Sequence, residues 1–170
     1  MKAIGLFFFA MMVSLGLCAY NAGVDGDESE DSQKVSIAVL KAFGQKFPQA
    51  VGVEWEREWR FYVADFRSPV EGMIPPLMCD MEAWFDSGAN WRMTVADVPF
   101  DKLPQVVKDG FAGGNYGTWK VDDAHIVERN GKDNIYIIEV EQRHMERDLY
   151  FNSRGELVKE AKSTDFKSLL

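Results

Sequence analysis

Few side chains in this 170-residue chain could do chemistry, and their spacing argues against most reactions. The chain has two histidines, His125 and His144, which fall in separate segments of its second half. A serine or cysteine nucleophile needs a base within reach, and a metal site needs several ligands at spacings such as His-x-His or Cys-x-x-Cys, which do not occur. We expect His125 on a sheet face and His144 exposed at a hairpin turn. The sequence therefore predicts no catalytic residue, no metal ligand and no cofactor.

Carboxylates are numerous and are the remaining candidates for acid–base chemistry. They alternate with apolar residues along the expected strands: Glu54, Glu56, Asp80, Glu82, Glu139 and Glu141. Hydrolysis of a glycoside needs two carboxylates that face each other across the substrate, whereas alternation is typical of the solvated face of a sheet. A carboxylate-based hydrolase is therefore the least favoured class of function.

The chain is acidic, with 27 Asp and Glu against 19 Lys and Arg, a formal net charge of −8 and a pI near 4.8. Nucleic-acid binding depends on Lys and Arg that neutralise phosphates, and anionic membrane surfaces attract basic segments. Both kinds of partner are therefore disfavoured. A hydrophobic content of 46% predicts a packed core.

Residues 1–19 are expected to be a signal peptide. Lys2 precedes an uncharged apolar stretch, Ala3–Leu17, which is too short to span a bilayer, and small residues then fit cleavage after Ala19. Residues 20–34 are rich in Gly, Asp, Glu and Ser, and are expected to form a flexible acidic linker. The mature chain would then be exported, with no transmembrane helix.

Processing as a lipoprotein is an alternative. Leu15-Gly16-Leu17-Cys18 resembles a bacterial lipobox, although Leu17 stands where that motif has a small residue, and it would place a lipid anchor on Cys18. Ordinary cleavage would leave Cys79 as the one cysteine, which excludes an intramolecular disulfide. Cys79 lies in a strand-like run without a nearby histidine, so we expect it to be a buried apolar side chain.

The remainder of the chain shows one pattern twice, an apolar stretch of helical period followed by alternating strands. We expect a first unit at 35–99, a second at 100–163 and a C-terminal tail at 164–170. A helix opens each unit, the second with Asp101 as its N-cap. The Asn-Gly pair within Asn130-Gly131-Lys132-Asp133 predicts a hairpin turn at these four residues. Each unit then has a helix and four antiparallel strands, which gives an α+β fold of two tandem units.

The order of short motifs along residues 35–163 resembles the PepSY-like family of exported Bacteroidetes proteins. The motifs are Phe47-Pro48-x-Ala50, Val53-x-Trp55, Tyr62-x-Ala64-x-Phe66, Ala83-x-Phe85-Asp86-x-x-Gly88 with Trp91, Leu103-Pro104, and Phe151 through Gly155 to Leu157. The chain departs from the family in a proline-rich insertion at 68–77, and in Asn152, which stands where the first unit has Asp86. The resemblance implies a two-layer fold similar to the β-lactamase inhibitor protein, with helices on one face of an antiparallel sheet, and it implies no catalytic residue.

The sheet face away from the helices is the candidate binding surface. If the helices cover the face with Tyr62, Ala64 and Phe66, strand alternation places another set on the opposite face. In the first unit this set is Trp59, Phe61, Val63, Asp80, Glu82 and Trp84, and in the second it is Ile135, Ile137, Glu139, Asp148 and Tyr150. An uncovered face should be polar, and aromatics between charges are typical of interface anchors. We expect Trp59, Phe61 and Trp84 to be partly exposed there; the alternative is that these aromatics pack internally.

The sequence thus predicts an exported, non-catalytic binding protein of the periplasm or cell surface. It would recognise a protein or peptide of the cell envelope through the open sheet face, and the fold resemblance suggests inhibition of an envelope enzyme, although fold alone does not establish function. The alternative is a carrier of a small ligand, which would require a concave pocket of roughly 300–1,000 Å³.

Overall fold

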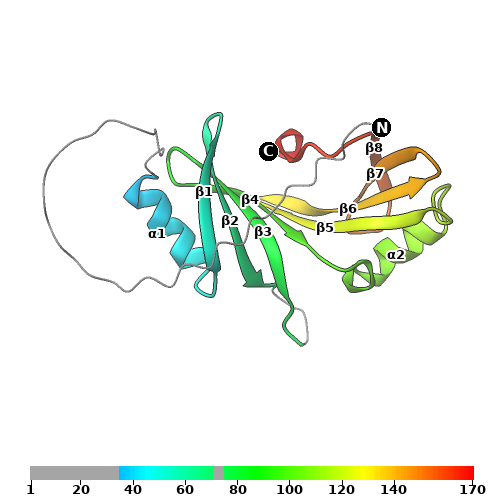
Figure 1. Cartoon of the computed structure of the whole chain (residues 1–170), viewed down its shortest axis with the longest axis horizontal. Helices are drawn as coiled ribbons and strands as arrows, with labels where there is room; N and C mark the ends of the chain where they lie inside the picture. The colour runs from blue at the N-terminus through cyan, green and yellow to red at the C-terminus, as the bar shows by residue number, and fades with distance from the viewer. Residues whose placement is uncertain (1–34, 71–74) are drawn as a thin grey trace, which may run out of the picture. The chain divides into compact units, whose positions relative to one another are not determined.

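The computed structural model describes residues 35–70 and 75–170, which form two α-helices and an eight-stranded antiparallel sheet (Figure 1). The first half contains α1 (Ile37–Lys46), β1 (Val51–Glu58), β2 (Phe61–Pro69), β3 (Met78–Asp86) and β4 (Trp91–Asp97). The second half contains the 3-10 helix η1 (Phe100–Lys102), α2 (Gln105–Ala112), β5 (Lys120–Arg129), β6 (Lys132–Gln142), β7 (Met145–Phe151), β8 (Leu157–Ala161) and the 3-10 helix η2 (Phe166–Leu169). The expected signal peptide, acidic linker and Cys18 anchor lie outside the described residues. In the described part, no helix is long and apolar enough to cross a bilayer.

The eight strands form one continuous sheet in which each strand pairs with the next along the chain. The expected α+β class with an antiparallel sheet is confirmed, and a helix followed by four strands occurs twice in the element order. The two sets of strands are not separate sheets, however, because β4 pairs with β5 from Met93 opposite Arg129 to Asp97 opposite His125. The tandem duplication itself stays a prediction.

Local sequence explains where the helices begin and end. The side chain of Ser36 accepts a hydrogen bond from the Val39 backbone N–H at 3.3 Å and caps α1, and the helix ends before Pro48. The predicted N-cap of α2, Asp101, is wrong, because that residue lies in η1. The α2 helix begins after Pro104 instead, where the proline ring fixes φ at −53° and no side-chain cap forms.

The two faces of the sheet bury two different hydrophobic clusters. On the helix face, α1 and α2 pack against the sheet through Val39, Phe43, Val107 and Phe111. The opposite face, here called the open face, carries its own buried cluster: Phe61, Val63, Trp84, Met93, Val95, Val127, Ile137 and Tyr150. Both helices lie on one side of the sheet and the C-terminal segment lies on the other (Figure 1).

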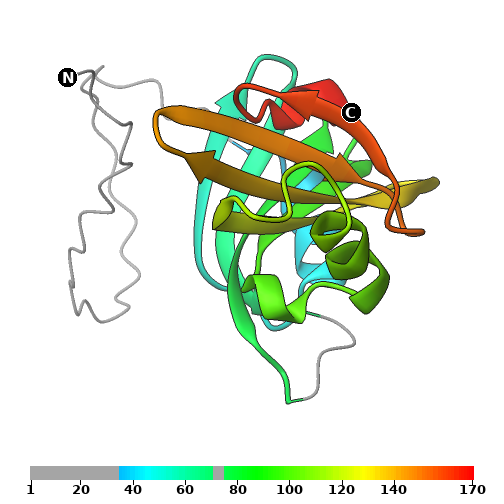
Figure 2. The same cartoon turned by 90° about the vertical axis from the view of Figure 1, so that its right-hand side faces the viewer.

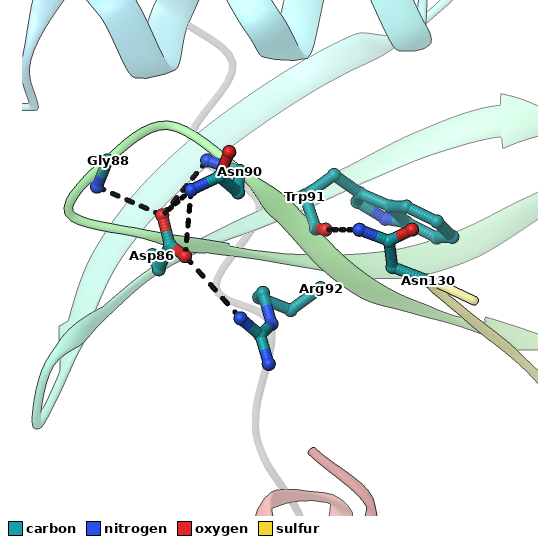
Figure 3. A network of polar contacts seen from close by, with 6 residues as sticks. All are labelled: Asp86, Gly88, Asn90, Trp91, Arg92 and Asn130. Atoms are coloured by element: carbon teal, nitrogen blue, oxygen red, sulfur yellow. Dashed lines mark hydrogen bonds and ion pairs between the residues drawn. The ribbon is translucent and has the colours of Figure 1, made fainter. Parts of the chain in front are cut away.

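The turn between β3 and β4 is held by the carboxylate of Asp86 (Figure 3). Its Oδ1 accepts hydrogen bonds from the backbone N–H groups of Gly88 and Asn90, both at 2.9 Å. The other carboxylate oxygen faces Arg92 at 3.6 Å. The carboxylate thus accepts hydrogen bonds from backbone N–H groups that the tight turn would otherwise leave without a partner.

The corresponding turn after β7 uses Asn152 in the same way. Its Oδ1 accepts from the backbone N–H groups of Arg154 at 2.9 Å and Glu156 at 3.1 Å. Asp and Asn side chains both carry an oxygen that can accept these hydrogen bonds. Asn152 can therefore hold its turn as Asp86 holds the corresponding turn of the first unit.

Candidate binding face

Trp59 does not lie on the sheet face. It occupies the two-residue turn between β1 and β2, has a positive φ of 54°, and is 80% exposed. The Arg60 guanidinium lies over its ring at 4.9 Å from the centroid. Trp59 is therefore a solvent-exposed aromatic at the rim of the open face, separate from the cluster on it.

Phe61, Val63 and Trp84 lie on the open face as the alternation predicts, but they are not partly exposed. Their exposed fractions are 6%, 0% and 3%, and the Phe61 and Trp84 rings contact each other with centroids 6.0 Å apart. The expected exposure is wrong because the cluster is covered by the last residues of the chain: Phe166, Leu169 and Leu170 pack against it. Nothing in the tail's local pattern indicates that it returns to the sheet.

The two acidic residues of the candidate surface lie nearer the other end of β3. Asp80 is exposed and pairs with Arg67 at 3.4 Å. Glu82 is half-buried and accepts a hydrogen bond from Trp84 Nε1 at 3.3 Å. Burial, with the neighbouring Asp65 carboxylate, outweighs that hydrogen bond and raises the pKa of Glu82 to about 7.

Asp65 is a residue that the candidate set omits, although β2 alternation places it on the same face. It stands opposite Glu54 on β1 and opposite Glu82 on β3. Burial raises its pKa to about 6, and the charges of Glu56 and Glu54 add to this effect. Among the described residues, no lysine or arginine forms an ion pair with Asp65 or Glu82.

His125 is enclosed by two carboxylates on the open face, which sequence reasoning missed. Its Nδ1 lies 2.6 Å from Asp97 Oδ1 and its Nε2 lies 3.0 Å from Glu139 Oε1, and the residue is only 8% exposed. Burial opposes the charged ring, but the two hydrogen bonds outweigh it and raise the pKa of His125 to about 9. A histidine that stays protonated at neutral pH is a poor general base and a poor metal ligand.

His144, in contrast, lies exposed in the turn between β6 and β7, as expected. No group of three or more His, Cys, Asp or Glu residues in the described ranges has the arrangement of a metal site. Cys79 is buried, and burial raises its pKa, which disfavours the reactive thiolate.

The open face therefore divides into two parts. The covered half is the hydrophobic cluster beneath the C-terminal segment. The acidic half lies beside it on β1 to β3: Glu54, Glu56, Asp65, Asp80 and Glu82. Two of these carboxylates, Asp65 and Glu82, are partly buried and have no ion pair among the described residues, and such groups beside an apolar cluster suit a partner that supplies cationic side chains.

A concave site also exists on the helix face. A cavity of about 790 Å³ is lined by Met81, Ala96 and Ile126 of the sheet, and by charged side chains that include Lys46 and Glu128. Its volume is in the range of small-ligand sites. The aromatics of the open face do not line it, so a carrier function would not use the residues that the sequence singled out.

Comparisons with known proteins agree with this architecture. A family model described as “Putative beta-lactamase-inhibitor-like, PepSY-like” matches residues 76–159. A BLIP-like protein from Bacteroides fragilis is 33% identical, with a TM-score of 0.65 over 76% of this chain and 89% of that one. A DUF2874 family protein from Bacteroides ovatus is 28% identical, with a TM-score of 0.67 over 76% and 89% of the two chains.

A protein from Bacteroides eggerthii, described as putative periplasmic, is 25% identical, with a TM-score of 0.66 over 75% of this chain and 88% of that one. The comparison with curated proteins found no match. The similar structures thus cover most of the described residues, including both halves of the sheet.

Proposed function

The chain belongs to the PepSY-like, beta-lactamase-inhibitor-like family, and from that premise we propose that it is an exported, non-catalytic protein that binds a cationic protein segment through the acidic half of its open face. The periplasm or the cell surface is the proposed location. The apolar N-terminal stretch and a similar structure described as putative periplasmic support it.

The observation that carries the proposal is the Asp65–Glu82 pair. These side chains are neighbours across β2 and β3, both are half-buried, and both have raised pKa values. Partly buried carboxyl groups without a cation destabilise the folded chain. A lysine or arginine from a partner would remove that cost, because an opposite charge nearby favours the ionised carboxylate.

Recognition without catalysis agrees with the chemistry of the face. His125 is enclosed between Asp97 and Glu139 and is charged at neutral pH, so it is not a base. Inhibition of an envelope enzyme is the finer form of the proposal. It would require that a cationic loop of that enzyme bind to the acidic half.

A calorimetric titration with hexalysine tests the site. At pH 8.5, above the raised pKa values of about 6 for Asp65 and about 7 for Glu82, the test variant Asp65→Asn/Glu82→Gln removes two charges from the acidic half. The control variant Asp109→Asn/Glu128→Gln also removes two charges and therefore has the same net charge as the test variant. Its two positions lie away from the open face, because Asp109 is on α2 and Glu128, opposite Thr94, is on the helix side of the sheet. We expect the test variant to bind about tenfold more weakly than the control.

Equal affinities for the two variants would contradict the site, because they would show that hexalysine responds only to net charge. Hexaglutamate should not bind any of the proteins. An envelope enzyme inhibited by the intact chain and by the control, but not by the test variant, would support the finer proposal.

A second candidate function, carriage of a small ligand, is favoured by the cavity on the helix face. Lys46 and Lys102 line it against one carboxylate, Glu128, in a chain of net charge −8. An anionic amphiphile would suit this cavity, because its apolar chain could contact the apolar sheet residues and its charged group could pair with a lysine. Laurate should then bind more weakly to Lys46→Gln than to Lys41→Gln, a control on the same helix, and no difference would exclude this candidate.

A further inference from the structure

The last seven residues of the chain, 164–170, lie on the open face and are held there by side chains. Their backbone hydrogen bonds are local, from Ser168 N–H to Asp165 at 3.1 Å and from Leu170 N–H to Lys167 at 3.3 Å. The segment therefore adds no strand to the sheet. Figure 2 shows it turning back after β8, and an ion pair between Lys167 and Glu58 brings it to β1.

The apolar side chains of this segment cover the hydrophobic cluster. Phe166, Leu169 and Leu170 are only partly buried, whereas the cluster residues beneath them are almost fully buried. The Phe166 ring also meets the His125 ring edge-on, with centroids 5.5 Å apart. Without the segment, an apolar patch would remain on the sheet, and such patches are typical of protein interfaces.

The polar contacts show what chemistry this surface accepts. Thr164 donates a hydrogen bond from Oγ1 to Asp148 Oδ2 at 2.6 Å, and Lys167 pairs with Glu58. Lys132 donates to the Leu170 carbonyl at 3.1 Å. The open face thus binds a segment that places a cation beside Glu58, between apolar side chains.

The segment is held weakly. Its apolar side chains are only partly buried, the Lys167 side chain is 53% exposed, and the backbone hydrogen bonds described above stay within the segment. Exposed ion pairs contribute little to stability, and burial of apolar surface contributes in proportion to the area removed from water. A segment that buries more apolar surface on the cluster would therefore bind more favourably than the chain's own.

We propose that residues 164–170 are a built-in occupant of the covered half, and that the partner displaces them with a segment of the same chemistry, one cationic side chain between an aromatic and aliphatic ones. This inference rests on the proposed function, which assigns the partner to the open face and gives it a second contact with the acidic half. A tethered segment has an effective concentration on the order of millimolar. A partner that bound the covered half alone would compete poorly against it, and simultaneous contact with the acidic half supplies the additional affinity.

Binding of the chain's own segment in trans tests the proposal. The probe is a fluorescent nonapeptide with the sequence of residues 162–170, and the readout is fluorescence anisotropy. The full chain with Phe166→Ser/Leu169→Ser has a weakened internal segment. The control Ile37→Ser/Val106→Ser removes two exposed apolar side chains from the helices. We expect the loosened variant to bind the peptide at least about tenfold more tightly than the control.

A peptide with Glu in place of the lysine at position 167 should lose that binding, because it would face Glu58 with a like charge. Cooperative thermal unfolding of both variants verifies that the sheet is intact. Equal peptide affinities for loosened variant and control would overturn the inference. Hexalysine binding reports on the acidic half separately, so that failure of the proposed function can be distinguished from failure of this inference.

Discussion

The covered half and the acidic half of the open face belong to one sheet and share β2 and β3, but they differ in what meets them. Apolar side chains of the covered half are buried by the chain's own C-terminal residues. In the acidic half, Asp65 and Glu82 face one another without a cation from the described chain. The difference indicates that the first half stabilises the fold, while the second half is kept at a cost in stability, as at many binding sites.

The largest effect should separate two tryptophans that the sequence treated as equivalent anchors. Trp84→Ala removes a buried ring and should lower the free energy of unfolding by about 3–5 kcal/mol. Trp59→Ala removes an 80% exposed ring from a turn and should change it by less than about 0.5 kcal/mol. Urea unfolding followed by circular dichroism measures both. Similar losses would show that the covered half is not the buried cluster described above.

The next effect concerns the charged His125, at the edge between the two halves. Its folded pKa of about 9 lies above the ordinary value of 6.5. Its contribution to stability is therefore complete below about pH 6.5 and lost as the pH rises through 9. It should account for about 3 kcal/mol of unfolding free energy.

Unfolding measured from pH 6 to 10 should show this loss in the wild type and in His144→Gln, whose residue lies in an exposed turn. His125→Gln should lack the loss. A wild-type profile that is flat over this range would contradict the enclosed imidazolium.

The acidic half should show a smaller effect of opposite sign. A carboxyl group with a raised folded pKa contributes stability fully below its unfolded pKa, and that contribution is lost as the pH rises through the folded value, about 7 for Glu82. Glu82→Gln should therefore raise the free energy of unfolding at pH 8 by about 1–2 kcal/mol, reduced from the full pKa shift because water screens a half-exposed group. The gain should vanish near pH 4. Glu128→Gln is the control for loss of a charge alone: Glu128 is exposed and pairs with Lys46 at 3.4 Å, so this variant should gain no stability at pH 8. A destabilised Glu82→Gln at pH 8 would contradict the unfavourable burial of the Glu82 carboxylate.

Local pattern predicted much of the fold. Alternation in β2 and β3 placed Phe61, Val63, Glu82 and Trp84 on the correct face. The hairpin predicted at residues 130–133 forms with Asn130 and Gly131 alone in the turn, where Gly131 has a positive φ of 68°, because β6 already begins at Lys132. These features depend on neighbours along the chain.

The rest depends on contacts between distant residues. The pairing of β4 with β5, the return of residues 164–170 to the open face, and the contact of His125 with Asp97 each join segments from different hairpins. No local period encodes such contacts. The sequence therefore identified the face but mistook its buried aromatics for its exposed surface, and it omitted Asp65.

Proton release on binding tests the central claim most directly. At pH 7, Glu82 and, to a smaller extent, Asp65 are partly protonated, because burial raises their pKa values to about 7 and 6. A cationic partner would lower both pKa values, so calorimetry with hexalysine in buffers of different ionisation enthalpy should detect release of a fraction of a proton from the intact chain and from Asp109→Asn/Glu128→Gln. No release should occur from Asp65→Asn/Glu82→Gln. Binding to the intact chain without proton release, or with equal release from all three proteins, would contradict the assignment of the acidic half as the binding surface.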